Sequence, residues 1–270
     1  MKENPIDRCA SLLAQAEASR QPAAPLTELY PNLALRDAYA VQQFNIERRL
    51  KAGETIRGHK IGLTARAMQI KFGVNEPDYG HLLNTMFIAD RGELDLSGLI
   101  DPQIEVEPAF VLKSRLMGPN LTAEAVLAAT DYVCVCFEVI DSRIEDWRIK
   151  LQDTVADNGS SALVALSEKR IRPDRVVLDD LDTVLEFDGR VVETGNSKDI
   201  LGHPANGIAW LGNALAPYGI ALEAGHVVLP GTCTKSRRVI GTKNIRGHMQ
   251  GLGEVVLNIV GKPTVTKFAS

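Results

Sequence analysis

Long apolar runs and runs of basic residues are both missing from this 270-residue chain. No stretch approaches the roughly 20 apolar residues that a membrane-spanning helix needs. No Lys/Arg-rich run is interleaved with aromatic residues, and the net charge is −4, which disfavours a nucleic-acid partner. The first residues lead into a polar amphipathic segment rather than a signal peptide. We therefore expect a cytoplasmic protein with no membrane and no nucleic-acid partner.

Cysteine is also scarce: the chain has four, Cys9, Cys134, Cys136 and Cys233. This number fits the cytosol, where thiols stay reduced. Cys134 and Cys136 have the same strand parity as Glu138, which raises the alternative of a Cys-x-Cys-x-Glu metal site. Zinc sites more often combine a wider cysteine spacing with a second ligand pair, which is absent here. We interpret these cysteines as small core residues.

The remaining composition is typical of a globular protein, with 45% hydrophobic and 24% charged residues and neither repeats nor low-complexity segments. Apolar periodicity predicts helices within the first fifty residues, around a proline-bearing linker over 21–31, and further helices over 65–73 and 122–130. Asp188-Gly189 predicts a β-hairpin. His203 precedes a proline and is expected on the entry loop of a helix. Because the strands lack regular helical crossovers, we predict an α+β fold: a small helical N-terminal region, 1–75, packing on a mixed β core, 76–265.

Two short acidic strands carry the strongest chemical signal. Ile104-Glu105-Val106-Glu107 and Cys136-Phe137-Glu138-Val139 are runs of β-branched and aromatic residues bounded by turn signals. Side chains alternate along a strand, so Glu105 and Glu107 share a face. Desolvation and like-charge repulsion oppose keeping three such carboxylates ionised, and a hard divalent cation with oxygen ligands resolves that conflict. The pattern predicts an open, catalytic metal site.

The alternative is a solvated strand face, which the Glu-x-Glu pair favours when it is taken alone. The flanking sequence favours burial, because an apolar run continues after the first strand and 132–140 is apolar on both faces apart from Glu138. Lys60 is expected at a strand end beside a glycine-bearing turn, a position that by itself fits a surface lysine as well as a catalytic one. Asp78, between Pro77 and Gly80, is by itself a turn former. The polar segment 153–161 is by itself a turn.

Six ordered motifs resemble the hydratase/decarboxylase family of meta-cleavage pathways, 2-oxopent-4-enoate hydratase-like proteins of the fumarylacetoacetate hydrolase superfamily. The resemblance covers about residues 30–260. The motifs are Gly58-His59-Lys60-Ile61-Gly62-Leu63-Thr64, Glu76-Pro77-Asp78-Tyr79-Gly80, Ile104-Glu105-Val106-Glu107, Glu138-Val139-Ile140-Asp141-Ser142-Arg143, Val155-Ala156-Asp157-Asn158 and Gly202-His203-Pro204-Ala205-Asn206-Gly207.

The resemblance implies a mixed β-sheet roll of the fumarylacetoacetate hydrolase type. It also implies that Glu105, Glu107 and Glu138 bind Mg²⁺ or Mn²⁺ and that Lys60 and Asp78 are catalytic, with their individual roles open. The residues expected to bind substrate are Leu63, Ser160, Gly231 and Thr232. Pro108 departs from the family pattern; because proline cannot donate to a sheet ladder, we expect this strand to lie at an edge or to bulge after Glu107.

The implied activity is addition of water to a 2-hydroxy-2,4-dienoate, giving a 4-hydroxy-2-oxo acid in aromatic-compound catabolism. The alternatives are a metal-dependent decarboxylase of a 2-oxo-3-enedioate, of the 4-oxalocrotonate type, and a non-catalytic partner subunit. The loop 142–147 favours the hydratase, and the intact Glu105, Glu107, Glu138 and Lys60 argue against the partner subunit. The family further implies a homo-oligomer that can form a complex with a neighbouring pathway enzyme.

Overall fold

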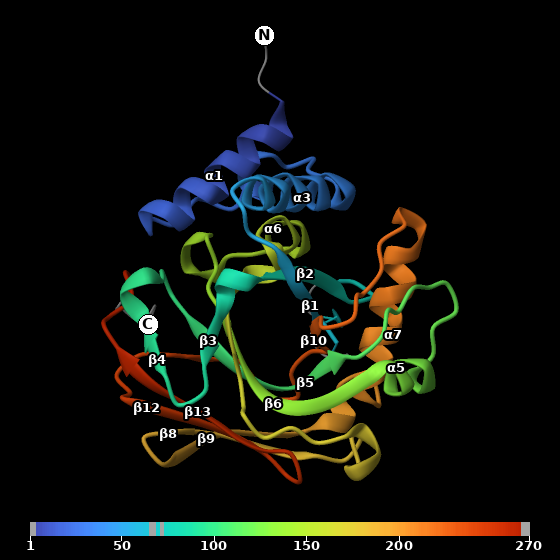
Figure 1. Ribbon diagram of the computed structural model, residues 1–270. Helices are drawn as coiled ribbons and strands as arrows, with labels where there is room; N and C mark the ends of the chain where they lie inside the picture. The colour runs from blue at the N-terminus through green and yellow to red at the C-terminus, as the bar shows by residue number, and fades with distance from the viewer. Residues whose placement is uncertain (1–3, 65–68, 71–72, 266–270) are drawn as a thin grey trace.

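The computed structural model describes residues 4–64, 69–70 and 73–265 and shows two β-sheets with helices around them (Figure 1). The helices are α1 (Pro5–Ser19), α2 (Leu26–Leu29), α3 (Leu35–Lys51), α5 (Ala123–Ala129), α6 (Leu151–Ala156) and α7 (Pro204–Leu215). The strands are β1 (Ile56–Gly62), β2 (Asp78–Leu83), β3 (Phe87–Ala89), β4 (Glu93–Asp95), β5 (Gln103–Leu112), β6 (Thr130–Ile140), β7 (Ser161–Leu166), β8 (Asp182–Phe187), β9 (Arg190–Asn196), β10 (Val227–Leu229), β11 (Arg237–Arg238), β12 (Asn244–Met249) and β13 (Gly253–Val260).

The larger sheet has the order β2-β1-β10-β5-β6-β7-β3, with β11 paired to β5. It mixes parallel pairs, such as β1 with β10, and antiparallel pairs, such as β5 with β6. The smaller sheet has the order β4-β13-β12-β8-β9. Together with the helices, these sheets confirm the α+β class that the sequence predicts.

The main core lies between the two sheets. Phe110 and Phe137 are fully buried there, on the faces of β5 and β6 that point toward the smaller sheet. Because side chains alternate along a strand, the opposite faces of β5 and β6 carry Glu107 and Glu138. The long β5–β6 pair, which curves through the lower half of Figure 1, thus separates the main core from the face with the carboxylates, on which Ala109 and Cys136 belong to a second apolar cluster.

The N-terminal helices form a separate apolar cluster. α1 begins after Asn4, whose side chain accepts a hydrogen bond from Ile6 N, and it buries Cys9 and Leu13. That cluster continues into Val155 of α6, so the helices pack on the rest of the chain, as Figure 1 shows. β1 follows α3 directly and belongs to the larger sheet. The division at residue 75 stays a prediction.

Several local predictions are confirmed. The helix α5 begins after its N-cap residue Thr122, and the Asp188-Gly189 turn joins β8 to β9. His203 is the N-cap residue of α7, where its side chain accepts a hydrogen bond from Ala205 N. The helix predicted over 65–73 falls mostly outside the described residues. Among the described residues, no helix is both long and apolar enough to cross a membrane.

The prediction for Pro108 is wrong. β5 lies inside the larger sheet, and its register with β6 runs through Pro108 and Val135 without a bulge. The missing N–H is tolerated because the other side of β5 pairs with β11 only at Gln103 and Ile104, and with β10 only from Phe110. Between these points a loop, not a strand, faces β5, and Thr232 Oγ1 donates to Val106 O.

Candidate active site

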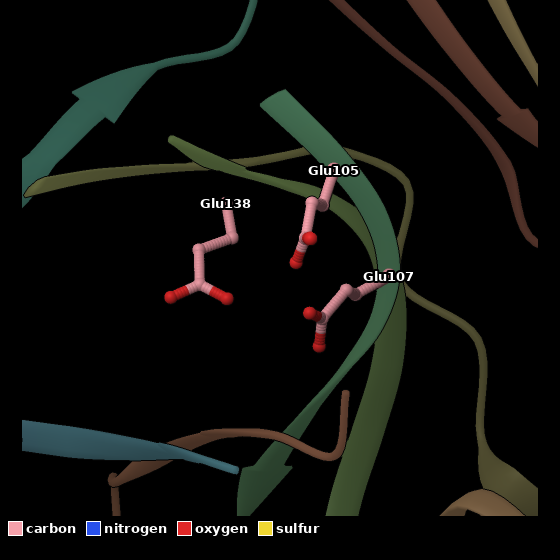
Figure 2. A group of neighbouring side chains, drawn as sticks. All are labelled: Glu105, Glu107 and Glu138. Atoms are coloured by element: carbon pink, nitrogen blue, oxygen red, sulfur yellow. The ribbon is translucent and has the colours of Figure 1, made fainter. Parts of the chain in front are cut away.

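Three carboxylates converge on the polar face of β5 and β6. Glu105 lies directly opposite Glu138 in the antiparallel register, and Glu107 is two residues further along β5 on the same face. One oxygen from each carboxylate lies within 4.8 Å of the others. Figure 2 shows the three side chains pointing into one space. The two-residue spacing of Glu105 and Glu107 predicted that they share a face, and the register of β5 with β6 brings Glu138 to the same face.

The protonation of this group reflects its burial. Burial, and then the charge of Glu138, raise the pKa of Glu105 to about 8. Burial also raises the pKa of Glu107 well above its ordinary value, with the charges of Glu138 and Glu105 adding to the effect. Glu107 Oε2 accepts a hydrogen bond of 2.8 Å from Gly231 N, but its buried Oε1 has no hydrogen-bond partner in the part of the chain that the structure describes. A buried, unpartnered carboxylate oxygen facing two other carboxylates fits a hard divalent cation, which takes oxygen ligands.

Lys60 is the cation that the described structure places against this group. It lies on β1, is 5% exposed, and its Nζ is 3.4 Å from Glu138 Oε1. Burial by itself lowers the pKa of Lys60, but the charges of Glu138 and Asp78 outweigh it and the pKa lies above its ordinary value. The ammonium therefore stays charged at neutral pH. The catalytic interpretation of Lys60 fits this position better than the surface interpretation does.

Asp78 begins β2 opposite Gly62, the last residue of β1. It is 3% exposed, and its buried Oδ1 has no hydrogen-bond partner among residues 4–64, 69–70 and 73–265. Burial raises the pKa of Asp78, and the charge of Lys60 opposes this rise. A Cβ atom at position 62 would lie 2.2 Å from Asp78 Oδ1, so only glycine lets the carboxylate sit where it does. Asp78 and Lys60 thus face the same interior from neighbouring strands.

The four expected substrate-binding residues come from three segments of the chain. Gly231 and Thr232 lie beside Glu107 and β5, through the Gly231 N and Thr232 Oγ1 hydrogen bonds given above. Leu63 follows β1 with a positive φ of 56°, and its carbonyl accepts a hydrogen bond from Gln69 Nε2. Ser160 is buried, and its hydroxyl lies 3.4 Å from Asp157 Oδ2. Their contacts with substrate stay predictions.

The structure also shows a buried ion pair beside the site, which was not predicted from the sequence. Arg143 Nε donates to Asp157 Oδ1 at 2.5 Å, and both side chains are almost completely buried. Neighbouring Ser161 donates its hydroxyl to Glu138 Oε1 at 3.2 Å, so the segment that contains Asp157 also contacts a member of the carboxylate group. The density of small polar residues over 153–161 was the available signal, but it is equally typical of an ordinary turn.

The family model of the fumarylacetoacetate (FAA) hydrolase C-terminal region matches residues 77–260, which include Asp78 and all three glutamates. The chain belongs to the fumarylacetoacetate hydrolase family. Within it, the chain is 42% identical to a 2-oxo-hept-4-ene-1,7-dioate hydratase of Escherichia coli, over 84% of this chain and 87% of the relative. It is 43% identical to a 2-hydroxypent-2,4-dienoate hydratase of Pseudomonas putida, over 82% of this chain and the full length of the relative.

The fold agrees with this family. A 4-oxalocrotonate decarboxylase from Pseudomonas putida G7, complexed with magnesium and adipate, superposes with a TM-score of 0.89. It is 37% identical in sequence, and the match covers 94% of this chain and 97% of the decarboxylase. The resemblance stated from the six motifs is therefore confirmed, and so is the fumarylacetoacetate hydrolase type of fold.

Proposed function

We propose that this protein is a metal-dependent hydro-lyase that adds water to a 2-hydroxy-2,4-dienoate, giving a 4-hydroxy-2-oxo acid. The observation that carries the proposal is the convergence of half-buried Glu105 with buried Glu107 and Glu138, together with the Lys60 ammonium 3.4 Å from Glu138. The hydratases among the relatives support the substrate class, because the identity extends over most of both chains.

Glu105, Glu107 and Glu138 are proposed to hold Mg²⁺ or Mn²⁺. Three carboxylates and an unpartnered Glu107 oxygen suit either hard ion, and the magnesium-containing decarboxylase supports the first. A divalent ion held there supplies Lewis-acid stabilisation of the negative charge that develops on a 2-oxo acid.

Lys60 and Asp78 are proposed to move the protons. The reaction moves the 2-hydroxyl proton of the dienol to C5 and then adds water across C3 and C4, with the hydroxyl group at C4 and a proton at C3. It therefore needs one group that donates a proton and one that accepts a proton from water. We assign proton donation to the Lys60 ammonium, which also offsets the negative charge of the substrate. We assign proton acceptance to the buried Asp78 carboxylate, whose Oδ1 has no hydrogen-bond partner among the described residues.

The direct test is ultraviolet absorbance of 2-hydroxypenta-2,4-dienoate in the presence of Mg²⁺ or of a chelator. We expect metal-dependent loss of the diene band, with formation of 4-hydroxy-2-oxopentanoate. Persistence of the band with Mg²⁺ or Mn²⁺ would refute the hydro-lyase assignment.

The two proton-transfer roles are separable in deuterated water. If Lys60 donates at C5, Lys60→Ala removes enzyme-dependent deuterium incorporation at that carbon. If Asp78 activates water, Asp78→Asn still incorporates deuterium at C5 but forms little hydrated product. The opposite pattern would exchange the two roles, and an unchanged pattern in both variants would remove them from the reaction.

Decarboxylation of a 2-oxo-3-enedioate is the second candidate, favoured by the superposition on 4-oxalocrotonate decarboxylase. It needs the same stabilisation of an enolate but no activated water. Incubation with 2-oxohex-3-enedioate separates the candidates, because a decarboxylase releases CO₂ and a hydro-lyase does not.

We also propose that the protein forms a homo-oligomer and that this homo-oligomer can bind a neighbouring pathway enzyme. Light scattering of the purified protein, alone and with that enzyme, tests both.

A further inference from the structure

The segment 157–161 is held rigidly at several points. The Arg143 guanidinium donates to the Asp157 carboxylate and, at 2.5 and 3.0 Å, to the carbonyls of Asp157 and Ser161. Asn158 is bonded on both sides of its amide to β2: Oδ1 accepts from His81 N at 2.7 Å, and Nδ2 donates to His81 O at 2.9 Å. The segment is thereby fixed to both β2 and the chain that leaves β6.

Gly159, at the centre of this segment, lies against the end of Lys60. A Cβ atom at position 159 would lie 2.5 Å from Lys60 Cε and 3.0 Å from Lys60 Nζ. On its other side, Lys60 Nζ is 3.4 Å from Glu138 Oε1, which also accepts a hydrogen bond from Ser161. The Lys60 ammonium is therefore confined between the backbone of Gly159 and the Glu138 carboxylate.

We propose that Gly159 is a positioning residue, which sets the place of the Lys60 ammonium at the active site by the absence of a side chain. The proposal rests on the function proposed above, in which Lys60 transfers a proton. Carbon atoms in contact lie about 3.5–4.0 Å apart. A methyl group at position 159 thus requires the end of Lys60 to shift by about 1 Å, because the hydrogen bonds of Arg143 and Asn158 hold the segment 157–161 in place.

Gly159→Ala tests this, and Gly219→Ala is the matched control. Gly159 has φ and ψ of 62° and 26°, and Gly219 has 69° and 16°. Alanine therefore suffers the same backbone strain at both positions, but a Cβ atom at 219 meets no atom of the described residues within 4 Å. We expect Gly159→Ala to lower kcat by about 10- to 100-fold, since a displacement of about 1 Å costs up to that much. Gly219→Ala is expected to stay within twofold of wild type.

A double variant shows whether Gly159 acts through Lys60. In a Lys60→Ala background the atoms that the new methyl group would displace are gone, so adding Gly159→Ala should lower kcat no further. Mn²⁺ affinity, measured by calorimetry, should stay within about threefold of wild type in Gly159→Ala. A crystal structure of that variant should show Lys60 Nζ displaced.

If Gly159→Ala does not fold, Asn158→Asp replaces it, because aspartate tolerates the positive φ of 56° at that position. It removes the hydrogen bond from Nδ2 to His81 O and frees the segment on one side. Its loss of kcat should also vanish in the Lys60→Ala background.

Three results would overturn the proposal: kcat of Gly159→Ala within twofold of wild type, an equal loss in Gly219→Ala, or a loss that adds to that of Lys60→Ala. A wild-type enzyme that does not hydrate the dienoate would refute the hydro-lyase assignment, and the positioning role with it. An active wild type with any of the three results refutes the positioning role alone.

Discussion

Replacing Lys60 by alanine separates proton transfer from metal binding. If Lys60 is a positioned acid, its loss lowers kcat by roughly 10²–10⁴-fold. The three glutamates stay in place in Lys60→Ala, because they lie on β5 and β6 while Lys60 lies on β1. The variant should therefore fold and still bind a divalent ion.

The charges predict the direction of the change in metal affinity. Two unit charges 3.4 Å apart, the separation of Lys60 Nζ and Glu138 Oε1, interact with about 5 kcal/mol at an effective dielectric constant of about 20. Without Lys60, the three carboxylates lose that stabilisation when no metal is bound. A cation that binds to them is also no longer repelled by the Lys60 ammonium. Mg²⁺ or Mn²⁺ should then bind at least as tightly as in wild type.

The assay combines steady-state hydration of 2-hydroxypenta-2,4-dienoate, metal titration by calorimetry and thermal melting. Lys113→Ala, a change at an exposed lysine, is the control and should match wild type in all three. A kcat within twofold of wild type would return Lys60 to a structural role. If Lys60→Ala lost metal affinity as well as kcat, the claim that Lys60 transfers a proton but is not needed for metal binding would be refuted.

Three further outcomes are expected. Glu107→Gln should abolish activity and its dependence on divalent ions together, since an amide is a much weaker ligand for a hard cation; full activity at saturating Mg²⁺ would exclude Glu107 from the site. Burial lowers the pKa of His81 to about 4 from 6.5, so the unfolded chain binds more protons between these values. The free energy of unfolding should therefore fall as pH falls through that window, by up to about 3 kcal/mol. In His81→Gln the free energy of unfolding, measured by urea denaturation, should depend less on pH, and an unchanged pH dependence would contradict this. Asp157→Asn leaves the buried Arg143 charge unpaired and should lower the free energy of unfolding by about 3–5 kcal/mol. A decrease below about 1 kcal/mol in the same denaturation experiment would contradict a stabilising role of the Arg143–Asp157 ion pair.

The acidic face of the site was predictable from sequence because it depends on local periodicity. Glu105 and Glu107 are two residues apart, so any strand puts them on one face. The apolar surroundings of Glu138 indicated that it is buried, and its exposure is 1%. The exact opposition of Glu105 and Glu138 depends on the register of β5 and β6, which periodicity does not determine.

Features that depend on distant contacts were not predictable in the same way. The Arg143–Asp157 pair joins two segments that each read as a polar loop. Pro108 was expected at a sheet edge, but an unpaired stretch inside a paired strand accommodates it equally well. No strand was predicted over 244–249, because Gly247 occupies one of its buried positions and glycine is depleted in strands. In the structure β12 lies between β8 and β13, at the centre of the smaller sheet.

Mass spectrometry of the product from 2-hydroxypenta-2,4-dienoate, with Mg²⁺ or with a chelator, tests the proposed function most directly. The predicted result is the mass of the substrate plus one water, formed by wild type with the metal and absent both with the chelator and in Glu107→Gln. Unchanged substrate in the presence of Mg²⁺ and Mn²⁺, or hydration that continues without a metal, would contradict it.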